Sequence, residues 1–203
     1  MDSIDYYDKH SNDYYEATVD LDMSKQLERF FELLPENAEV LDLGCGSGRD
    51  TVWLEEAGCY VTPMDGSAQM CELAGIYTDK EVLNLTFSEM DFEEVFDGIW
   101  ACASLTHVSK SEIDIIMDKV EKALCPDGVL YMSYPEGEGT EEAHGRTFNK
   151  YTPEELHSML KKHGGLEIID IWLSDDVRPG NDRQWVNVLA RKIGGLDKED
   201  GEE

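Results

Sequence analysis

The chain has 203 residues, of which 41% are apolar and 31% charged, as is typical of a soluble globular protein. Its 45 acidic and 17 basic side chains give a formal net charge of −28, which disfavours nucleic acid and anionic membranes as partners. The five cysteines include no Cys-x-x-Cys pair, so we expect free thiols, a reducing, cytoplasmic environment and no metal site. The sequence shows neither a membrane-spanning apolar run nor a signal-peptide pattern.

The N-terminal segment, residues 2–20, is acidic and rich in tyrosine. Its periodicity favours a short helix that packs on the domain, with Tyr7 and Tyr14 near one face; a lid over a site is the alternative. A second helix is predicted from residue 24 to about residue 34, because Leu, Phe, Phe and Leu recur there at helical spacing.

The rest of the chain alternates between strand-like and helix-like segments. Strands are predicted over residues 40–43, 60–65, 82–87, 96–102, 129–133, 166–172 and 185–191. Helices are predicted over residues 50–57, 67–77, 111–124 and 153–162. This alternation indicates a single α/β domain with a mostly parallel sheet, in which the last two strands pair antiparallel. We expect the domain to occupy residues 1–193 and the acidic tail, residues 194–203, to be disordered.

A glycine-rich segment, residues 42–48, reads Asp-Leu-Gly-Cys-Gly-Ser-Gly at the end of the first predicted strand. Alternate glycines let the backbone approach a bound molecule closely, and open α/β sheets bind ligands at this end of their strands. The dinucleotide pattern Gly-x-Gly-x-x-Gly fails in both frames, since the third position holds Arg or Thr, and no phosphate-binding Gly-Lys-Ser/Thr motif exists. The segment fits Asp-x-Gly-x-Gly-x-Gly instead.

That pattern resembles the class I S-adenosylmethionine-dependent methyltransferases, and the resemblance extends over most of the chain. Three further features follow in the family's order: Asp65 at the end of the second strand, Asp91 before the fourth, and the segment 96–108. The resemblance implies a Rossmann-like three-layer sandwich with a seven-stranded, mostly parallel sheet whose last strand is antiparallel. It also implies S-adenosyl-L-methionine as the cofactor.

The resemblance also implies which residues hold the methyl donor. Asp65 would accept hydrogen bonds from the ribose hydroxyls, a role favoured over that of a turn residue before Gly66. Asp91 would meet the adenine amino group, unless it is one more surface acid. The implied cofactor-binding residues are Asp42, Gly44, Cys45, Gly46, Gly48, Asp65, Gly66, Met90, Asp91, Phe92, Ala103 and Tyr14. Tyr14 is included because small family members often fold an N-terminal helix over the donor, which makes residues 1–35 a candidate lid.

The methyl acceptor leaves a weaker signal in the sequence. His107, just past the fourth strand, is the candidate catalytic base, with a structural role as an equal alternative. Arg146 and Tyr151 are candidates for the acceptor pocket, and Arg146 could bind an anionic acceptor. Asp176 and Arg178 are expected to form an ion pair without a chemical role.

We expect a small-molecule acceptor. A tRNA-modifying methyltransferase working with a partner, and a donor-binding module without turnover, remain alternatives. The sequence indicates neither the acceptor nor the oligomeric state.

Overall fold

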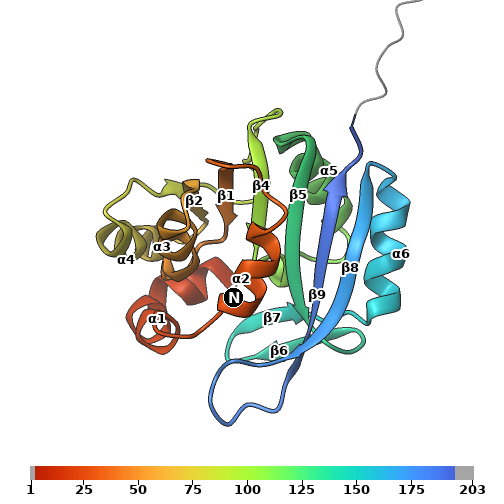
Figure 1. The fold of residues 1–203 in the computed structure, drawn as a ribbon. Helices are drawn as coiled ribbons and strands as arrows, with labels where there is room; N and C mark the ends of the chain where they lie inside the picture. Colours follow the sequence, from red (N-terminus) through yellow and green to blue (C-terminus); the bar gives the residue numbers. More distant parts are fainter. Residues whose placement is uncertain (1–2, 195–203) are drawn as a thin grey trace, which may run out of the picture.

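The computed structural model describes residues 3–194, which form one central sheet with helices on both faces (Figure 1). The strands of the sheet are β1 Glu39–Leu43, β2 Tyr60–Asp65, β3 Leu83–Asn84, β4 Phe96–Ala101, β5 Leu124–Pro135, β8 Leu166–Asp175 and β9 Gln184–Lys192. Their order is β3-β2-β1-β4-β5-β9-β8. The first five strands pair parallel, whereas β9 pairs antiparallel with both β5 and β8. The predicted seven-stranded sheet with an antiparallel last strand is therefore confirmed.

Helices cover both faces of this sheet. They are α2 Ser24–Phe31, α3 Arg49–Glu56, α4 Ala68–Thr78, α5 Ile113–Ala123 and α6 Pro153–His163. One apolar cluster joins Phe30 of α2 and Leu54 of α3 to Trp100 in the sheet. The other cluster joins Met117 of α5 and Leu160 of α6 to the opposite face. The three-layer arrangement that the resemblance implies is confirmed.

Local capping chemistry explains where two of these helices begin. The Ser67 hydroxyl accepts a hydrogen bond from the Met70 amide at 3.1 Å and caps α4. At α6, Thr152 and Glu155 form a reciprocal capping box. Helix α6 ends at Gly164, which adopts the left-handed conformation with φ 70°.

Two segments differ from the sequence-based prediction. Strand β3 is only two residues long, and at its end the Asn84 side chain donates to the carbonyls of Asp65 and Gly66. The segment 134–150, for which neither a strand nor a helix was predicted, contains a hairpin of β6 Thr140–Ala143 and β7 Arg146–Asn149. Its two-residue turn has positive φ at both positions, the geometry that matches strand twist.

Helix α1 Ser3–Thr18 and the β6–β7 hairpin lie at the same end of the sheet, at the bottom of Figure 1. This is the end at which the parallel strands finish, so both elements lie where α/β sheets bind ligands. No helix among residues 3–194 is both long and apolar enough to cross a bilayer. Beyond Gly194, the tail that was predicted to be disordered lies outside the described residues.

Candidate functional site

The glycine-rich turn after β1 is held against β2 by its own backbone. The amides of Gly44 and Cys45 donate to the Met64 carbonyl at 2.8 and 3.0 Å. Gly44 has φ +81°, and a Cβ there would lie 2.5 Å from the Cβ of Ser104, so only glycine fits. A Cβ on Gly48 would lie 2.7 Å from Cγ2 of Thr78, so this third glycine serves packing against α4.

A cavity opens beside this turn, and we call it the glycine-side cavity. It encloses about 660 Å³ counted out to its mouth. Its walls come from the ends of β1, β2 and β4, from the segment after β3, and from α1. The residues that line this cavity include Gly44, Gly46, Asp65, Gly66, Phe87, Ala103, Ser104, His107, Tyr7 and Tyr14.

Asp65 presents an oriented carboxylate to the glycine-side cavity. Its Oδ2 accepts from the Gly46 amide at 3.0 Å and its Oδ1 accepts from the Ser67 amide at 2.9 Å. Burial raises the pKa of this carboxyl group. Each carboxylate oxygen retains further acceptor capacity, so the group can bind a pair of neighbouring hydroxyls.

Two other residues that were predicted to bind the methyl donor, Asp42 and Cys45, are buried and do not line the cavity. Asp42 is buried and accepts from the Thr51 hydroxyl at 2.6 Å. Burial and the neighbouring charge of Asp50 raise the pKa of Asp42. Burial also raises the pKa of the Cys45 thiol. Both residues therefore support the turn from below.

The structure does not bring Met90, Asp91 and Phe92 to either cavity described here. Met90 is fully buried in the core, and the ring of Phe92 packs edge-on against Phe96 at 5.1 Å between centroids. Asp91 is exposed and pairs with Lys122 at 3.2 Å.

The short third strand is the physical reason for this difference. Because β3 ends at Asn84, the chain reaches the glycine-side cavity early, at Thr86 and Phe87. Residues 90–92 come later in the chain and lie in the core or on the surface, away from this cavity. The sequence signal for this cavity wall is Phe87. It lies three positions after the end of β3, but the strand predicted over residues 82–87 includes it.

A second cavity, the arginine-side cavity, adjoins the first. It encloses about 760 Å³ out to its mouth, and its walls include Arg49, Arg146, Phe148, Arg178, Trp185 and Asn187. Tyr7, Tyr14, Cys102 and Ala103 line both cavities and form the boundary between them. Ala103 is held there with φ +55° by a hydrogen bond from its amide to the Ser133 hydroxyl at 2.9 Å.

Tyr7 links the two cavities through a chain of polar contacts. Its hydroxyl lies 2.9 Å from Nε2 of His107 and accepts from Nη1 of Arg146 at 3.3 Å. Nδ1 of His107 lies 2.7 Å from the Thr147 carbonyl, which can only accept, so Nδ1 carries the proton. Nε2 is then the acceptor for the Tyr7 hydroxyl. Burial, aided by the charge of Arg146, lowers the pKa of His107 to about 4, so its ring is neutral.

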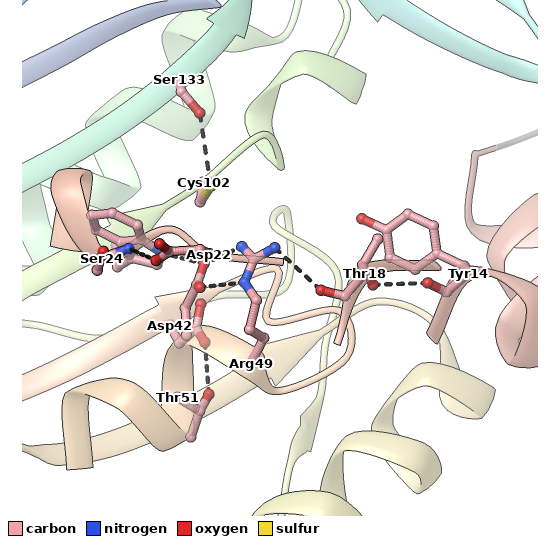
Figure 2. A network of polar contacts seen from close by, with 11 residues as sticks. Tyr14, Thr18, Asp22, Ser24, Asp42, Arg49, Thr51, Cys102 and Ser133 are labelled. Atoms are coloured by element: carbon pink, nitrogen blue, oxygen red, sulfur yellow. Dashed lines mark hydrogen bonds and ion pairs between the residues drawn. The ribbon is translucent and has the colours of Figure 1, made fainter. Parts of the chain in front are cut away.

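Helix α1 lies across both cavities and is attached by polar groups. Asp8 accepts from the Ser67 hydroxyl at 2.6 Å. At the other end of α1, Arg49 reaches from α3 to the Thr18 carbonyl at 3.4 Å, as Figure 2 shows. By contrast, α2 belongs to the core through Phe30, so the part of residues 1–35 that covers the cavities is mainly α1.

The predicted acceptor residues separate in the structure. Arg146 lines the arginine-side cavity, whereas Tyr151 is buried against Tyr134, with ring centroids 4.7 Å apart, and lines neither cavity. The ion pair of Asp176 and Arg178 is confirmed, and both residues lie on the cavity wall. They directly follow the carboxyl end of β8, which runs in the same direction as β5, so they reach the same edge of the sheet as Asp65.

Comparisons with known proteins agree with this geometry. The model of the methyltransferase domain family matches residues 15–171. The ubiquinone biosynthesis O-methyltransferase of Actinobacillus pleuropneumoniae is 29% identical over 108 residues, 47% of this chain and 44% of that protein. The trans-aconitate 2-methyltransferase of Deinococcus radiodurans is 32% identical over 110 residues, 51% of this chain and 41% of that protein. The chain thus spans less than half the length of these two relatives.

A solved structure extends the likeness to the whole fold. The 1,6-didemethyltoxoflavin-N1-methyltransferase of Burkholderia thailandensis superposes with a TM-score of 0.80 at 24% identity, covering 94% of this chain and 87% of that one. The family match covers well over half of the chain. The chain therefore belongs to the class I S-adenosylmethionine-dependent methyltransferases.

Proposed function

We propose that the chain transfers the methyl group of S-adenosylmethionine to a small-molecule acceptor. The donor would occupy the glycine-side cavity and the acceptor the arginine-side cavity. The observation that carries the proposal is the boundary that the two cavities share, formed by Tyr7, Tyr14, Cys102 and Ala103. A methyl group presented at this boundary faces the second cavity directly, which is the alignment that methyl transfer requires.

The residues of the glycine-side cavity fit the parts of this donor. Asp65 can accept from both ribose hydroxyls. Gly44 and Gly46 allow close approach to the backbone, and Phe87 offers an apolar surface to the adenine ring. The Ser104 hydroxyl is buried without a hydrogen-bond partner among the described residues, so it is available to the polar amino-acid part of the donor.

S-adenosylmethionine would supply a methyl group that is already electrophilic, so the chain must orient the acceptor and accept its proton. We assign that second task to Tyr7 and His107. An acceptor hydroxyl or amine would give its proton to the Tyr7 oxygen while Tyr7 passes its own proton to Nε2 of His107. Tyr7 ends neutral and His107 ends as an imidazolium, which rests on the Thr147 carbonyl.

Two observations favour a small-molecule acceptor over tRNA. The relatives named above carry names that refer to small acceptors: ubiquinone biosynthesis, trans-aconitate and didemethyltoxoflavin. The net charge of −28 also opposes a polyanion unless a partner supplies cations. A donor-binding module without turnover differs from this proposal in its kinetics alone.

Calorimetric titration with S-adenosylhomocysteine tests the donor site. We expect the wild-type chain to bind it and Asp65→Ala to lose at least about tenfold in affinity, since two hydroxyl contacts disappear. Asp91→Ala is the matched control, because Asp91 is an exposed acid outside the cavities, and it should bind normally. Failure of the wild type to bind, or equal binding by both variants, contradicts the proposal.

Turnover separates the enzyme from the donor-binding module. Release of S-adenosylhomocysteine is measured with a panel of small hydroxyl, amine and carboxyl acceptors. Release that depends on the acceptor supports the proposal, whereas tight donor binding without release for any acceptor supports the module.

A further inference from the structure

We infer that the acceptor is a carboxylic acid with a flat apolar body, bound with its carboxylate against Arg146 in the arginine-side cavity. This inference rests on the function proposed above, because it names the class of molecule that occupies the acceptor cavity. It follows from the charges of the cavity, from the unused donors of Arg146 and from the aromatic walls.

Most charged side chains of this cavity are held in ion pairs, and Arg146 is not. The charged side chains on its wall are Arg49, Arg146, Arg178, Asp175 and Asp176. Arg49 is neutralised by Asp50, to which its Nε donates at 2.7 Å. Arg178 donates hydrogen bonds from Nε and Nη2 to the Asp176 carboxylate, and Nε1 of Trp185 donates to the same carboxylate at 3.1 Å.

Two charged residues remain after these pairs are removed. Asp175 is exposed at the end of β8 and accepts from the Gln184 amide. Arg146 makes no ion pair with any of residues 3–194. In a chain of net charge −28, the inner part of the cavity thus holds an uncompensated cation.

Aromatic rings surround the guanidinium of Arg146, and part of its set of N–H donors is unused. The guanidinium carbon lies 4.6 Å from the ring centroid of Tyr6 and 5.0 Å from that of Phe148. Nη1 donates to Tyr7, whereas the Nε–H is buried without a hydrogen-bond partner among the described residues. A buried donor without a partner is costly, and a planar carboxylate matches the guanidinium fork.

The remaining walls suit the body of such an acid. Phe148, Tyr131 and Trp185 present aromatic surface to the cavity, and the indole of Trp185 is fixed by Asp176. Flat apolar groups pack well against such rings. A neutral acceptor would leave Arg146 uncompensated, and a cationic acceptor would be repelled by it, so the cavity selects an anion.

A matched pair of probes tests the inference. 4-Hydroxybenzoate and 4-hydroxybenzamide have the same ring and differ in charge. Each is titrated by ligand-observed NMR into the wild-type chain saturated with S-adenosylhomocysteine, at millimolar concentrations suited to ligands of this size. We expect the acid to bind at least about tenfold more tightly than the amide. Equal binding of the two, tighter binding of the amide, or no binding of the acid overturns the inference.

Variants then assign the preference to one side chain. Arg146→Gln should abolish the preference for the acid while the affinity for S-adenosylhomocysteine stays within about threefold of wild type. Arg191→Gln is the matched control, because Arg191 pairs with the Asp127 carbonyl at the opposite end of the sheet, and it should keep the preference. A preference that persists in Arg146→Gln overturns the inference.

A second variant covers the case in which Arg146→Gln fails to fold. Arg146→Lys keeps the charge but loses the fork, so the preference should fall severalfold. An unchanged preference overturns the inference. If the wild type fails to bind S-adenosylhomocysteine, the proposed function itself has failed, and this result is distinct from a failed acid preference in a chain that binds it.

Discussion

The neutral state of His107 predicts a specific dependence of stability on pH. In the folded chain burial lowers the pKa of His107 from 6.5 to about 4. Below about pH 6.5 the unfolded chain gains a proton at this residue and the folded chain does not, so stability is full above that pH and falls as the pH approaches 4. The gap between the two pKa values corresponds to about 3 kcal/mol in total, of which about 2 kcal/mol is lost by about pH 5.

Urea unfolding of the wild type and of His107→Asn measures this contribution. Asparagine retains an amide that can donate to the Thr147 carbonyl but cannot titrate. The titration runs from about pH 8 to about pH 5, which stays above the pI of 4.3, where the loss of net charge promotes precipitation. The free energy of unfolding of the wild type, relative to the variant, should fall by about 2 kcal/mol over this range.

An exposed histidine supplies the control. His157 is exposed on α6, so His157→Asn makes the same substitution outside the site and reports any general effect of replacing a histidine. If the difference between the wild type and His107→Asn does not change with pH, His107 is not held neutral by its surroundings.

Three further changes test separate parts of the structure. Gly44→Ala places a Cβ 2.5 Å from that of Ser104, so the affinity for S-adenosylhomocysteine should fall at least about tenfold by calorimetry, and an unchanged affinity refutes the close approach. Thr152→Ala removes the α6 capping box and should lower the free energy of unfolding by about 1 kcal/mol in urea, with normal donor affinity. Tyr7→Phe removes the hydroxyl between the cavities and should slow single-turnover methylation by about 100-fold, while a rate close to that of the wild type rules out the relay.

The fold was predictable because the relevant signals are local. The fourth strand is apolar almost throughout, as a central parallel strand must be, and Ser67 and Thr152 mark the starts of their helices. The final antiparallel strand followed from a connection too irregular to hold a helix. The hairpin at Thr140–Asn149 was missed because its turn pairs histidine with glycine, and a charged, glycine-rich segment also describes an ordinary loop.

The site was predictable only where strand ends define it. Asp65, Gly44 and Ala103 each lie at or just after the carboxyl end of a parallel strand, and a parallel sheet brings those positions to one edge. Whether residues 90–92 or Phe87 reach the cavity depended on the length of β3, which its sequence does not reveal. The aromatic wall around Trp185 comes from an antiparallel strand that enters from the opposite direction, so no rule about strand ends identifies it.

Helix α1 contributes to the walls of both cavities and so connects them. Tyr7 and Tyr14, 4.9 Å apart between ring centroids, face both cavities from the same helix. The attachments of α1 run through site residues, since Tyr7 bonds to His107 and Arg146, while Asp8 bonds to Ser67 beside Asp65. With the cavities assigned as proposed, we expect a ligand in either one to add contacts to this helix. Donor and acceptor would then favour each other's binding, by linkage, by equal factors.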